Sequence, residues 1–257
     1  MKPAYLIDLD GTLYAGDNPI PHAPEFIHYL KQENRPYLLV TNCPSRTAAQ
    51  VVEKLAGLSI HVPERAVLTS GMAAAMYLKE QGLERVFLLG GESVRQELES
   101  RSIGLVQENS DCVLVAWDKN FSYEKLERAA RQIRNGAVLV CTNPDKVIPG
   151  NLGPVPHSGS LCAAVESASG ACAVMLGKPG PHMARYALAL LGTEPQNTIM
   201  VGDLQETDIR FANNNGMRGA LMLTGLTGRE DISSQDPPTF VFESLSDLVA
   251  HDRENYL

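Results

Sequence analysis

The segment that most constrains this chain lies at its start, where a short apolar run ends in two carboxylates and a glycine. Residues 4–7 are Ala-Tyr-Leu-Ile, which have the length and composition of a buried strand. Side chains two apart on extended backbone point the same way, so Asp8 and Asp10 should emerge together at the carboxyl end of that strand. Open α/β sheets bind their ligands at this end. By itself, however, an Asp-x-Asp-Gly sequence is also an ordinary turn.

Three later stretches also place polar side chains after an apolar run. Two carboxylate charges about 4 Å apart repel by roughly 4 kcal/mol at an effective dielectric near 20, so such a pair normally holds a cation or shares a proton. The order along the chain is an acid pair, a threonine, a lysine and a second acid pair. The residues are Asp8 and Asp10, Thr41 followed by Asn42, Lys178, and Asp203 with Asp208.

At these residues the chain resembles the haloacid dehalogenase superfamily and, within it, the NagD-like or p-nitrophenyl phosphatase group. The matching motifs are DLDGTLY at 8–14, VTN ending at Asn42, GKP at 177–179, and GD at 202–203 followed by a second Asp five residues on. Each string is short, but four of them in family order, each with a strand-like lead-in, make a specific signal. The resemblance covers nearly the whole length and implies a phosphoric monoester hydrolase.

Alternating strand and helix patterns predict the α/β class, with a doubly wound, Rossmann-like parallel sheet as the core. After residue 82 a new strand–helix series begins that contains none of the four motifs. An inserted domain produces that distribution, and the resemblance implies the same, an α/β cap between the threonine and lysine motifs. We expect a catalytic core at residues 1–82 and 176–257, and an inserted α/β cap domain at residues 83–175.

Hydrophobic periodicity predicts the individual helices, and Ser45 is a candidate N-cap for the second of them. The expected helices cover residues 25–32, 45–55, 71–79, 93–99, 123–133, 160–167 and 183–191. The expected strands cover residues 4–7, 37–40, 85–89, 113–116, 137–141 and 198–201, and a further apolar run covers 171–176.

The resemblance implies four catalytic residues. Asp8 is expected to be the nucleophile that forms an aspartyl-phosphate. Asp10 is expected to donate a proton to the leaving oxygen and later to take one from the attacking water. Thr41 would hydrogen-bond a phosphoryl oxygen, and Lys178 would balance the charge of the nucleophile and the phosphoryl group. Taken singly, Thr41 is also readable as a plain strand terminus and Lys178 as a solvated loop cation.

The resemblance also implies a Mg²⁺ site. Asp8, Asp203 and the backbone carbonyl of Asp10 would form an oxygen-only shell, which suits a hard cation that retains water ligands. Asp208 would support these ligands from the next layer of residues around the ion. An alternative for Asp208 is an acidic residue at a helix start, where the helix dipole favours it.

Substrate-binding residues are expected in the cap. The loop at 142–145 follows a strand-like run and resembles the substrate-facing loop of the family, so Asn143 and Asp145, together with Asn42 from the core, are the expected substrate contacts. A plain Asx/Pro turn is nearly as good an interpretation of the same loop. His157 stands where relatives often carry glycine and could touch substrate, although a solvated loop histidine is the favoured interpretation. Cys43, followed by a proline where the family often has small polar residues, is not expected to be a nucleophile.

Composition excludes several classes of protein. The chain has 22 basic and 30 acidic residues, a net charge of −8, and no Lys/Arg cluster, so neither nucleic acid nor an anionic membrane is a favoured partner. No apolar stretch approaches the roughly 20 residues that a membrane helix needs, and the first strand leaves no room for a signal peptide, so a cytoplasmic location is expected. The five cysteines show no C-x-x-C spacing, which argues against disulfides and structural zinc.

The expected function is Mg²⁺-dependent hydrolysis of small phosphorylated metabolites, either sugar phosphates or nucleoside monophosphates, with p-nitrophenyl phosphate as an artificial substrate. A homodimer formed through the cap is compatible with the resemblance. Two alternatives stay open on the same fold: a phosphotransferase or phosphomutase, and a non-catalytic phospho-accepting signalling protein. Chain length and the second acidic loop at Asp203 count against the signalling protein.

Overall fold

A computed structural model describes residues 2–150 and 152–256. The chain divides into two compact units. The core unit comprises Met1–Thr41, Ala48–Leu68 and Lys178–Leu257, and the inserted unit comprises Asn42–Thr47 and Thr69–Gly177. The return to the core at Lys178 lies close to the predicted boundary at 175/176. The inserted unit begins at Thr69, ahead of the predicted boundary at residue 83, and also takes the short segment after Thr41.

The core unit is built on a six-stranded sheet of order β15-β14-β13-β1-β4-β5. Strands β15, β14, β13, β1 and β4 pair in parallel. Every residue of β1 and β13 is buried, as in a sheet that is covered on both faces. The strands are β1 (Ala4–Ile7), β4 (Tyr37–Thr41), β5 (Val67–Thr69), β13 (Thr198–Gly202), β14 (Arg218–Met222) and β15 (Phe240–Phe242).

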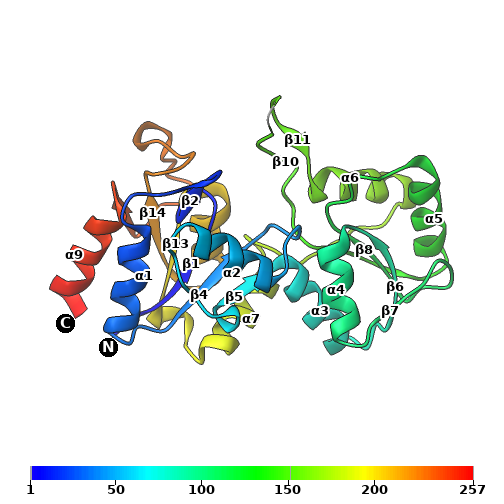
Figure 1. Cartoon of the computed structure of the whole chain (residues 1–257). Coiled ribbons are helices and arrows are strands. Elements are labelled where there is room, and N and C mark those ends of the chain that lie inside the picture. The colour runs from blue at the N-terminus through cyan, green and yellow to red at the C-terminus, as the bar shows by residue number, and fades with distance from the viewer. Residues whose placement is uncertain (1, 151, 257) are drawn as a thin grey trace. The chain divides into compact units, whose positions relative to one another are not determined.

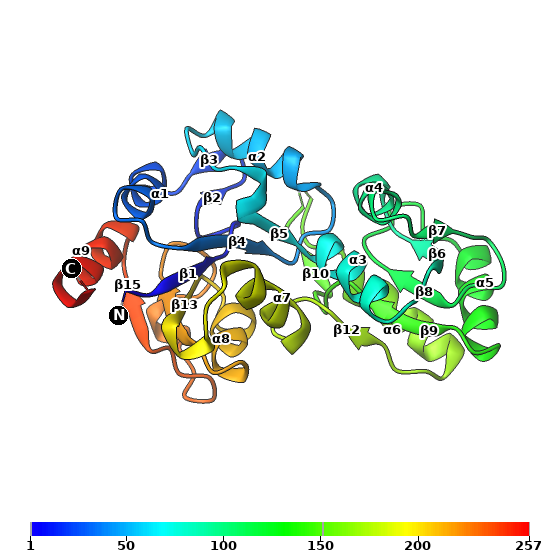
Figure 2. The same ribbon diagram turned by 90° about the horizontal axis from the view of Figure 1, so that it is seen from below.

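Helices cover both faces of this sheet. Figure 2 shows α1 and α2 on one face of the sheet and α7 and α8 on the other, and Figure 1 gives a second view of α1, α2 and α7, so the predicted doubly wound α/β core is confirmed. A small hairpin of β2 (Tyr14–Ala15) and β3 (Asn18–Pro19) follows the first strand. The helices are α1 (Ala23–Gln32), α2 (Ala48–Gly57), α7 (Pro181–Leu191), α8 (Arg210–Asn214) and α9 (Leu245–Tyr256), with a π-helical turn η3 (Gln205–Ile209) before α8.

The second helix begins later than predicted. Helix α2 begins at Ala48, so Ser45 is not its N-cap. The Ser45 hydroxyl instead lies 2.9 Å from the Cys43 sulfur, and the hydroxyl of Ser93 donates to the carbonyl of Pro44. Residues 42–47 therefore form a loop that belongs to the inserted unit, and the helix can start only after it.

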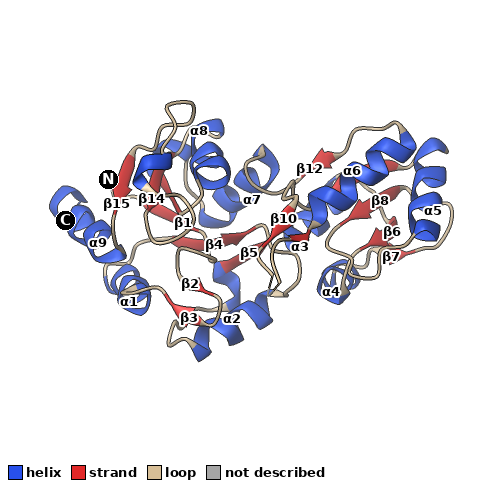
Figure 3. Ribbon diagram, turned by 90° about the horizontal axis from the view of Figure 1, so that it is seen from above, coloured by secondary structure: helices blue, strands red, loops and turns tan. Residues whose placement is uncertain are grey.

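The inserted unit contains a second parallel sheet, of five strands in the order β12-β9-β8-β6-β7. Alternate residues of its central strands face opposite layers: Val86 packs with Ala74 and Val94, whereas Phe87 packs with Ala129. Figure 3 shows the helices on either side of this sheet. The elements are α3 (Ser70–Glu80), β6 (Arg85–Leu89), α4 (Glu92–Ser100), β7 (Gly104–Leu105), β8 (Cys112–Val115), α5 (Tyr123–Arg134), β9 (Val138–Cys141), β10 (Val147–Ile148), β11 (Val155–Pro156), α6 (Ser158–Ser169) and β12 (Val174–Met175).

Packing explains the early start of the inserted unit. Helix α3, predicted as the last core element, contributes Ala74, Ala75 and Leu78 to the same buried cluster as Val86 of β6 and Val94 of α4. Its small residues allow close approach to α4. The apolar run at 171–176 forms only the short strand β12, paired with β9.

Two expectations drawn from composition can be compared with the structure. None of the described helices is both long and apolar enough to cross a membrane. None of the five cysteines, all of them within the described residues, forms a disulfide, as their spacing predicted.

A buried polar cluster joins the first strand to the last helix. Asp252 of α9 accepts hydrogen bonds from the hydroxyls of Tyr5 and Tyr29, the latter at 2.5 Å. It also pairs with Arg35 at 2.5 Å, and both side chains of this ion pair are almost fully buried. A buried ion pair is weak proof of added stability, but removing one partner leaves an uncompensated charge.

We therefore predict that Asp252→Asn lowers the free energy of unfolding by about 3–5 kcal/mol, because Arg35 stays buried without a counter-ion. The measurement is chemical denaturation at neutral pH. Glu254→Gln, on the exposed face of the same helix, is the matched control and should change stability by no more than about 0.5 kcal/mol. Equal effects of the two substitutions would contradict this assignment.

Candidate active site

The ends of three parallel strands meet at one edge of the core sheet. Register pairs Ile7 of β1 with Val201 of β13 and with Leu39 of β4. Asp8 follows Ile7 directly, and its backbone N–H donates to the carbonyl of Val201 at 2.9 Å. Asp203 follows β13, and Thr41 ends β4. The sheet topology therefore brings together residues that are far apart in the sequence.

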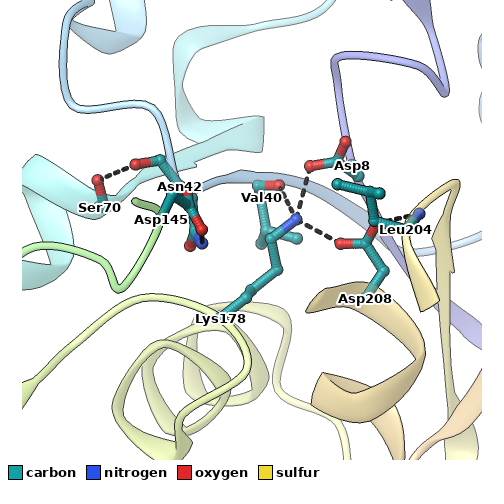
Figure 4. Close-up of polar contacts among 8 residues, drawn as sticks. All are labelled: Asp8, Val40, Asn42, Ser70, Asp145, Lys178, Leu204 and Asp208. Carbon is teal, nitrogen blue, oxygen red and sulfur yellow. Dashed lines mark hydrogen bonds and ion pairs between the residues drawn. The ribbon is translucent and has the colours of Figure 1, made fainter. Parts of the chain in front are cut away.

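Lys178 is the central cation of this edge. Only 1% of its surface is exposed, so the solvated-loop alternative is wrong. Its ammonium group donates to Asp8 Oδ1 at 2.6 Å and to Asp208 Oδ1 at 2.7 Å, and also to the carbonyl of Val40 at 3.3 Å (Figure 4). Burial alone would lower the pKa of Lys178, but the charges of Asp208 and Asp8 outweigh it and raise that pKa. The lysine is therefore held in its charged form.

Three carboxylates surround this region. One oxygen from each of Asp8, Asp203 and Asp208 lies within 4.8 Å of the others. Asp208 sits in the π-helical turn η3, where its Oδ2 accepts the backbone N–H of Leu204 at 3.1 Å and its Oδ1 accepts Lys178. Its carboxylate thus takes part in the cluster, and the helix-start alternative does not account for these contacts.

Negative charge is in excess in this cluster. Burial raises the pKa of Asp8 well above its ordinary value, and the ammonium of Lys178 opposes that rise. The charges of Asp208 and Asp203 add to it. Burial, together with the charge of Asp208, also raises the pKa of Asp203 to about 6. One lysine does not balance three carboxylates, so the site favours an added proton or cation.

The surroundings of Asp203 fit a hard metal ion. Its Oδ2 accepts the N–H of Leu226 at 2.9 Å, whereas its buried Oδ1 has no hydrogen-bond partner among the described residues. Glycine backbone encloses the carboxylate closely: a Cβ at Gly11 would lie 2.3 Å from Oδ2, and one at Gly225 would lie 1.9 Å from it. An oxygen-only donor set of this kind suits Mg²⁺.

The segment that follows β14 was not expected in the site. Gly225 and Leu226 both contact Asp203, and the Thr224 hydroxyl donates to the carbonyl of Gly11 at 2.8 Å. The sequence does carry a signal for it, because the apolar run that becomes β14 is followed by Thr and Gly, as the other strand ends are followed by polar residues.

Two further predicted residues lie at the same strand ends. Asp10 is exposed, two residues beyond Asp8, and forms a backbone bridge with Tyr14. Its carboxylate is outside the group formed by the other three, which is compatible with the predicted use of its backbone carbonyl. Thr41 is buried at the end of β4, next to the Val40 carbonyl that Lys178 contacts.

The predicted substrate contacts lie in the inserted unit, where they bind one another. Asn42 Nδ2 donates to Asp145 Oδ1 at 3.1 Å. Asn143 is fully buried, and its Nδ2 donates to the Asn42 carbonyl at 2.9 Å, while its Oδ1 accepts the Asp145 N–H at 3.2 Å. The amide of Asn143 is thus used to shape the loop. The expected substrate contacts of Asn42, Asn143 and Asp145 remain predictions.

His157 and Cys43 differ from each other in environment. His157 is 1% exposed, so the favoured interpretation of a solvated loop histidine is wrong. His157 directly precedes α6, and its ring lies against the loop that contains Asn143, which accounts for its burial. Burial lowers the pKa of His157 to about 4, so it is neutral at physiological pH. Cys43 is half-buried beside Ser45.

A doubly wound parallel sheet with carboxylates and a buried lysine at its strand ends places the chain among the α/β proteins that bind ligands at the carboxyl ends of their strands. Comparison with known proteins narrows this class. Family models described as haloacid dehalogenase-like hydrolase and HAD-hydrolase-like match residues 5–104 and 175–248. The chain therefore belongs to the haloacid dehalogenase-like hydrolase family.

Individual relatives agree with that membership. The chain is 39% identical over 249 residues to the 5'-nucleotidase YutF of Bacillus subtilis, covering 96% of this chain and 97% of the relative. It is 39% identical over 252 residues to an acid sugar phosphatase of Staphylococcus aureus, covering 96% of each. The solved structure of NagD from E. coli K-12 matches with a TM-score of 0.90 and 30% identity, covering 95% of this chain and 97% of that one. The predicted family and enzyme class, a HAD-type phosphatase, are confirmed.

The glycine enclosure of Asp203 generates a prediction. Gly225→Ala should displace the Asp203 carboxylate, because the new methyl group would overlap it. We expect kcat/KM for phosphate ester hydrolysis to fall by about 10²-fold, the loss typical of a misplacement near 1 Å. Gly57→Ala is the control, since a Cβ there meets nothing within 4 Å. Unchanged activity in Gly225→Ala, with the fold verified by circular dichroism, would contradict the assigned role of this glycine.

Proposed function

We propose that this enzyme hydrolyses small phosphate monoesters in a Mg²⁺-dependent reaction through an aspartyl-phosphate on Asp8. One observation carries the proposal: the buried ammonium of Lys178 lies between Asp8 and Asp208, in a carboxylate cluster whose third member, Asp203, has an unpartnered buried oxygen. Such a site has a nucleophile of the right type, a charge that stabilises a phosphoryl group, and oxygen donors for a cation.

The proposed roles follow from position. Asp8 attacks phosphorus, because its carboxylate lies at the strand end and Lys178 holds one of its oxygens. The exposed Asp10 protonates the leaving oxygen and then takes a proton from the attacking water. Lys178 and the Thr41 hydroxyl stabilise the transferring phosphoryl group. Hydrolysis of the aspartyl-phosphate regenerates the carboxylate of Asp8 and releases inorganic phosphate.

The cofactor that fits is Mg²⁺. The carboxylates of Asp8 and Asp203 and the carbonyl of Asp10 would hold it, and Asp208 would orient the group through Lys178 and the backbone of Leu204. When bound, the ion neutralises negative charge that would otherwise repel the phosphate dianion.

The proposed substrates are sugar phosphates and nucleoside monophosphates. Support comes from the relatives named 5'-nucleotidase and acid sugar phosphatase. The net charge of −8 disfavours a polyanionic nucleic acid as substrate. A substrate panel that contains both metabolite classes is the test that distinguishes them.

We predict that the enzyme releases inorganic phosphate from such a panel, and that Asp8→Asn reduces kcat on the order of 10⁴-fold or more while leaving the protein folded, because Asp208 still pairs with Lys178. The asparagine keeps the shape but loses the nucleophile. Asp17→Asn, in the exposed hairpin turn of the same unit, is the matched control and should retain full activity. Appreciable hydrolysis by purified Asp8→Asn, or transfer of phosphate to a second hydroxyl without release, would contradict the proposal.

The metal proposal predicts a pH-dependent thermal shift. Burial raises the pKa of Asp203 in the folded, metal-free protein from 3.8 to about 6. Between these two pH values the Asp203 carboxyl is protonated in the folded protein and ionised in the unfolded chain. The contribution of Asp203 to metal-free stability therefore falls as pH rises from about 4 to about 6. Mg²⁺ competes with that proton, so it should raise the midpoint more at pH 8 than at pH 5.

Asp203→Asn is the control for this measurement. It replaces a charged carboxylate ligand by a neutral amide, so it should abolish most of the Mg²⁺-induced shift. Scans are run at matched ionic strength with KCl in place of MgCl₂. A shift of the same size in Asp203→Asn, or full phosphatase activity in excess chelator, would rule out this metal site.

A further inference from the structure

His157 is a buried titratable residue that the proposed reaction does not use. It precedes Ser158, the first residue of α6, and its ring centroid lies 5.3 Å from that of Trp117. Its Nδ1 lies 3.2 Å from Asn143 Oδ1. Its Nε2 is buried and has no hydrogen-bond partner within the described part of the chain. In a neutral imidazole one ring nitrogen is a donor and the other is an acceptor, so the bond at Nδ1 also fixes the state of Nε2.

The neighbouring amide determines the tautomer. Asn143 Nδ2 lies 2.9 Å from the backbone carbonyl of Asn42, and a carbonyl can only accept. The Asn143 Oδ1 is therefore an acceptor, so the bond from His157 requires hydrogen on Nδ1. Burial, which lowers the pKa of His157 to about 4, agrees with the neutral ring. The Nδ1–H tautomer leaves Nε2 as an unused acceptor.

The Asn143 amide holds two backbone segments at once. Its Nδ2 binds the Asn42 carbonyl, which also accepts the hydroxyl of Ser70 at 2.6 Å. Its Oδ1 accepts the backbone N–H of Asp145 at 3.2 Å, and Asp145 Oδ1 in turn accepts from Asn42 Nδ2 at 3.1 Å. Rotation of this amide by half a turn would break both sets of bonds, and the N–H of His157 is a donor that disfavours the rotated form.

We propose that His157 is a positioning residue of the phosphatase: its Nδ1–H fixes the Asn143 amide, which in turn holds the backbone of Asn42, the residue directly after Thr41. This inference rests on the proposed function only in its kinetic part. Because Thr41 acts on the phosphoryl group common to all substrates, a loss of positioning should affect every phosphate ester alike. A direct contact from His157 to a leaving group would affect substrates unequally.

Two near-isosteric variants separate the two nitrogens of the ring. His157→Asn places an amide N–H near the position of Nδ1 and keeps the bond to Asn143, whereas His157→Gln places its amide near Nε2 and loses that bond. We expect His157→Asn to retain kcat/KM within a few-fold of the wild type. We expect His157→Gln to lose roughly 10–100-fold, the usual effect of removing a group that orients a functional residue, and to lose it equally on p-nitrophenyl phosphate, a sugar phosphate and a nucleoside monophosphate.

His251→Asn is the matched control, because His251 also has a buried, unpartnered Nε2 but packs on Phe240 of the core sheet. It should leave kcat/KM unchanged. Equal losses in His157→Asn and His157→Gln, with matching losses of thermal stability, would indicate packing alone and overturn the proposal. If His157→Gln kept the wild-type kcat/KM while His157→Asn lost it, and the loss depended on the substrate, the result would overturn the proposal in favour of a direct contact from Nε2 to substrate.

Two measurements do not depend on activity. The ¹⁵N shifts of the imidazole in the wild-type protein should report the Nδ1–H tautomer, and the opposite tautomer would overturn the proposal. Hydrogen exchange at residues 42–47 should accelerate in His157→Gln and not in His157→Asn; unchanged exchange in both would also overturn it. If the wild type releases no phosphate from any ester, the proposed function fails, while the tautomer and exchange results still decide the role of His157.

Discussion

The contact on which the site depends is the burial of Lys178 between two carboxylates. An ammonium ion with 1% exposure is stable in a protein interior only when its charge is paired and its protons are hydrogen-bonded. Asp8, Asp208 and the Val40 carbonyl supply those bonds, and they come from the ends of β1 and β4 and from the turn η3. The same contacts that make the lysine tolerable therefore align the proposed nucleophile.

Lys178 does not balance the charge of all three carboxylates, and the third of them, Asp203, is closely surrounded by glycine backbone. Asp203 is enclosed so closely that two of the surrounding positions have room only for hydrogen in place of a side chain, at Gly11 and Gly225. Gly11 also has a φ of +82°, which favours glycine. An excess of carboxylates with an unpartnered oxygen is unfavourable by itself, and the cation that we propose would offset that repulsion.

Around Asn143 the inserted unit uses mostly neutral polar groups, whereas the core site uses charges. The loop is held by a network of amides, hydroxyls and one uncharged imidazole, nearly all of it buried, together with the carboxylate of Asp145. Neutral hydrogen bonds lose less solvation than ions on burial, and they impose direction. A network of this type suits a loop whose geometry matters more than its charge.

Strand-length apolar runs and glycine turns are local features, so the α/β class and the order of the motif residues along the chain could be predicted from the sequence. Short motifs that resemble a known family also predicted Asp8, Lys178, Asp203 and Asp208 as site residues, and the structure brings them together. The sequence did not show that Lys178 is buried, that Gly225 and Leu226 lie against Asp203, or that His157 is buried beside the Asn143 loop. Those properties arise when strands distant in sequence align in register and their end loops converge, so they exist only in the folded chain. The start of the inserted unit is a further property that depends on packing. The small apolar residues of α3 do not by themselves indicate a partner, and their contact with α4 and β6 places α3 in the inserted unit.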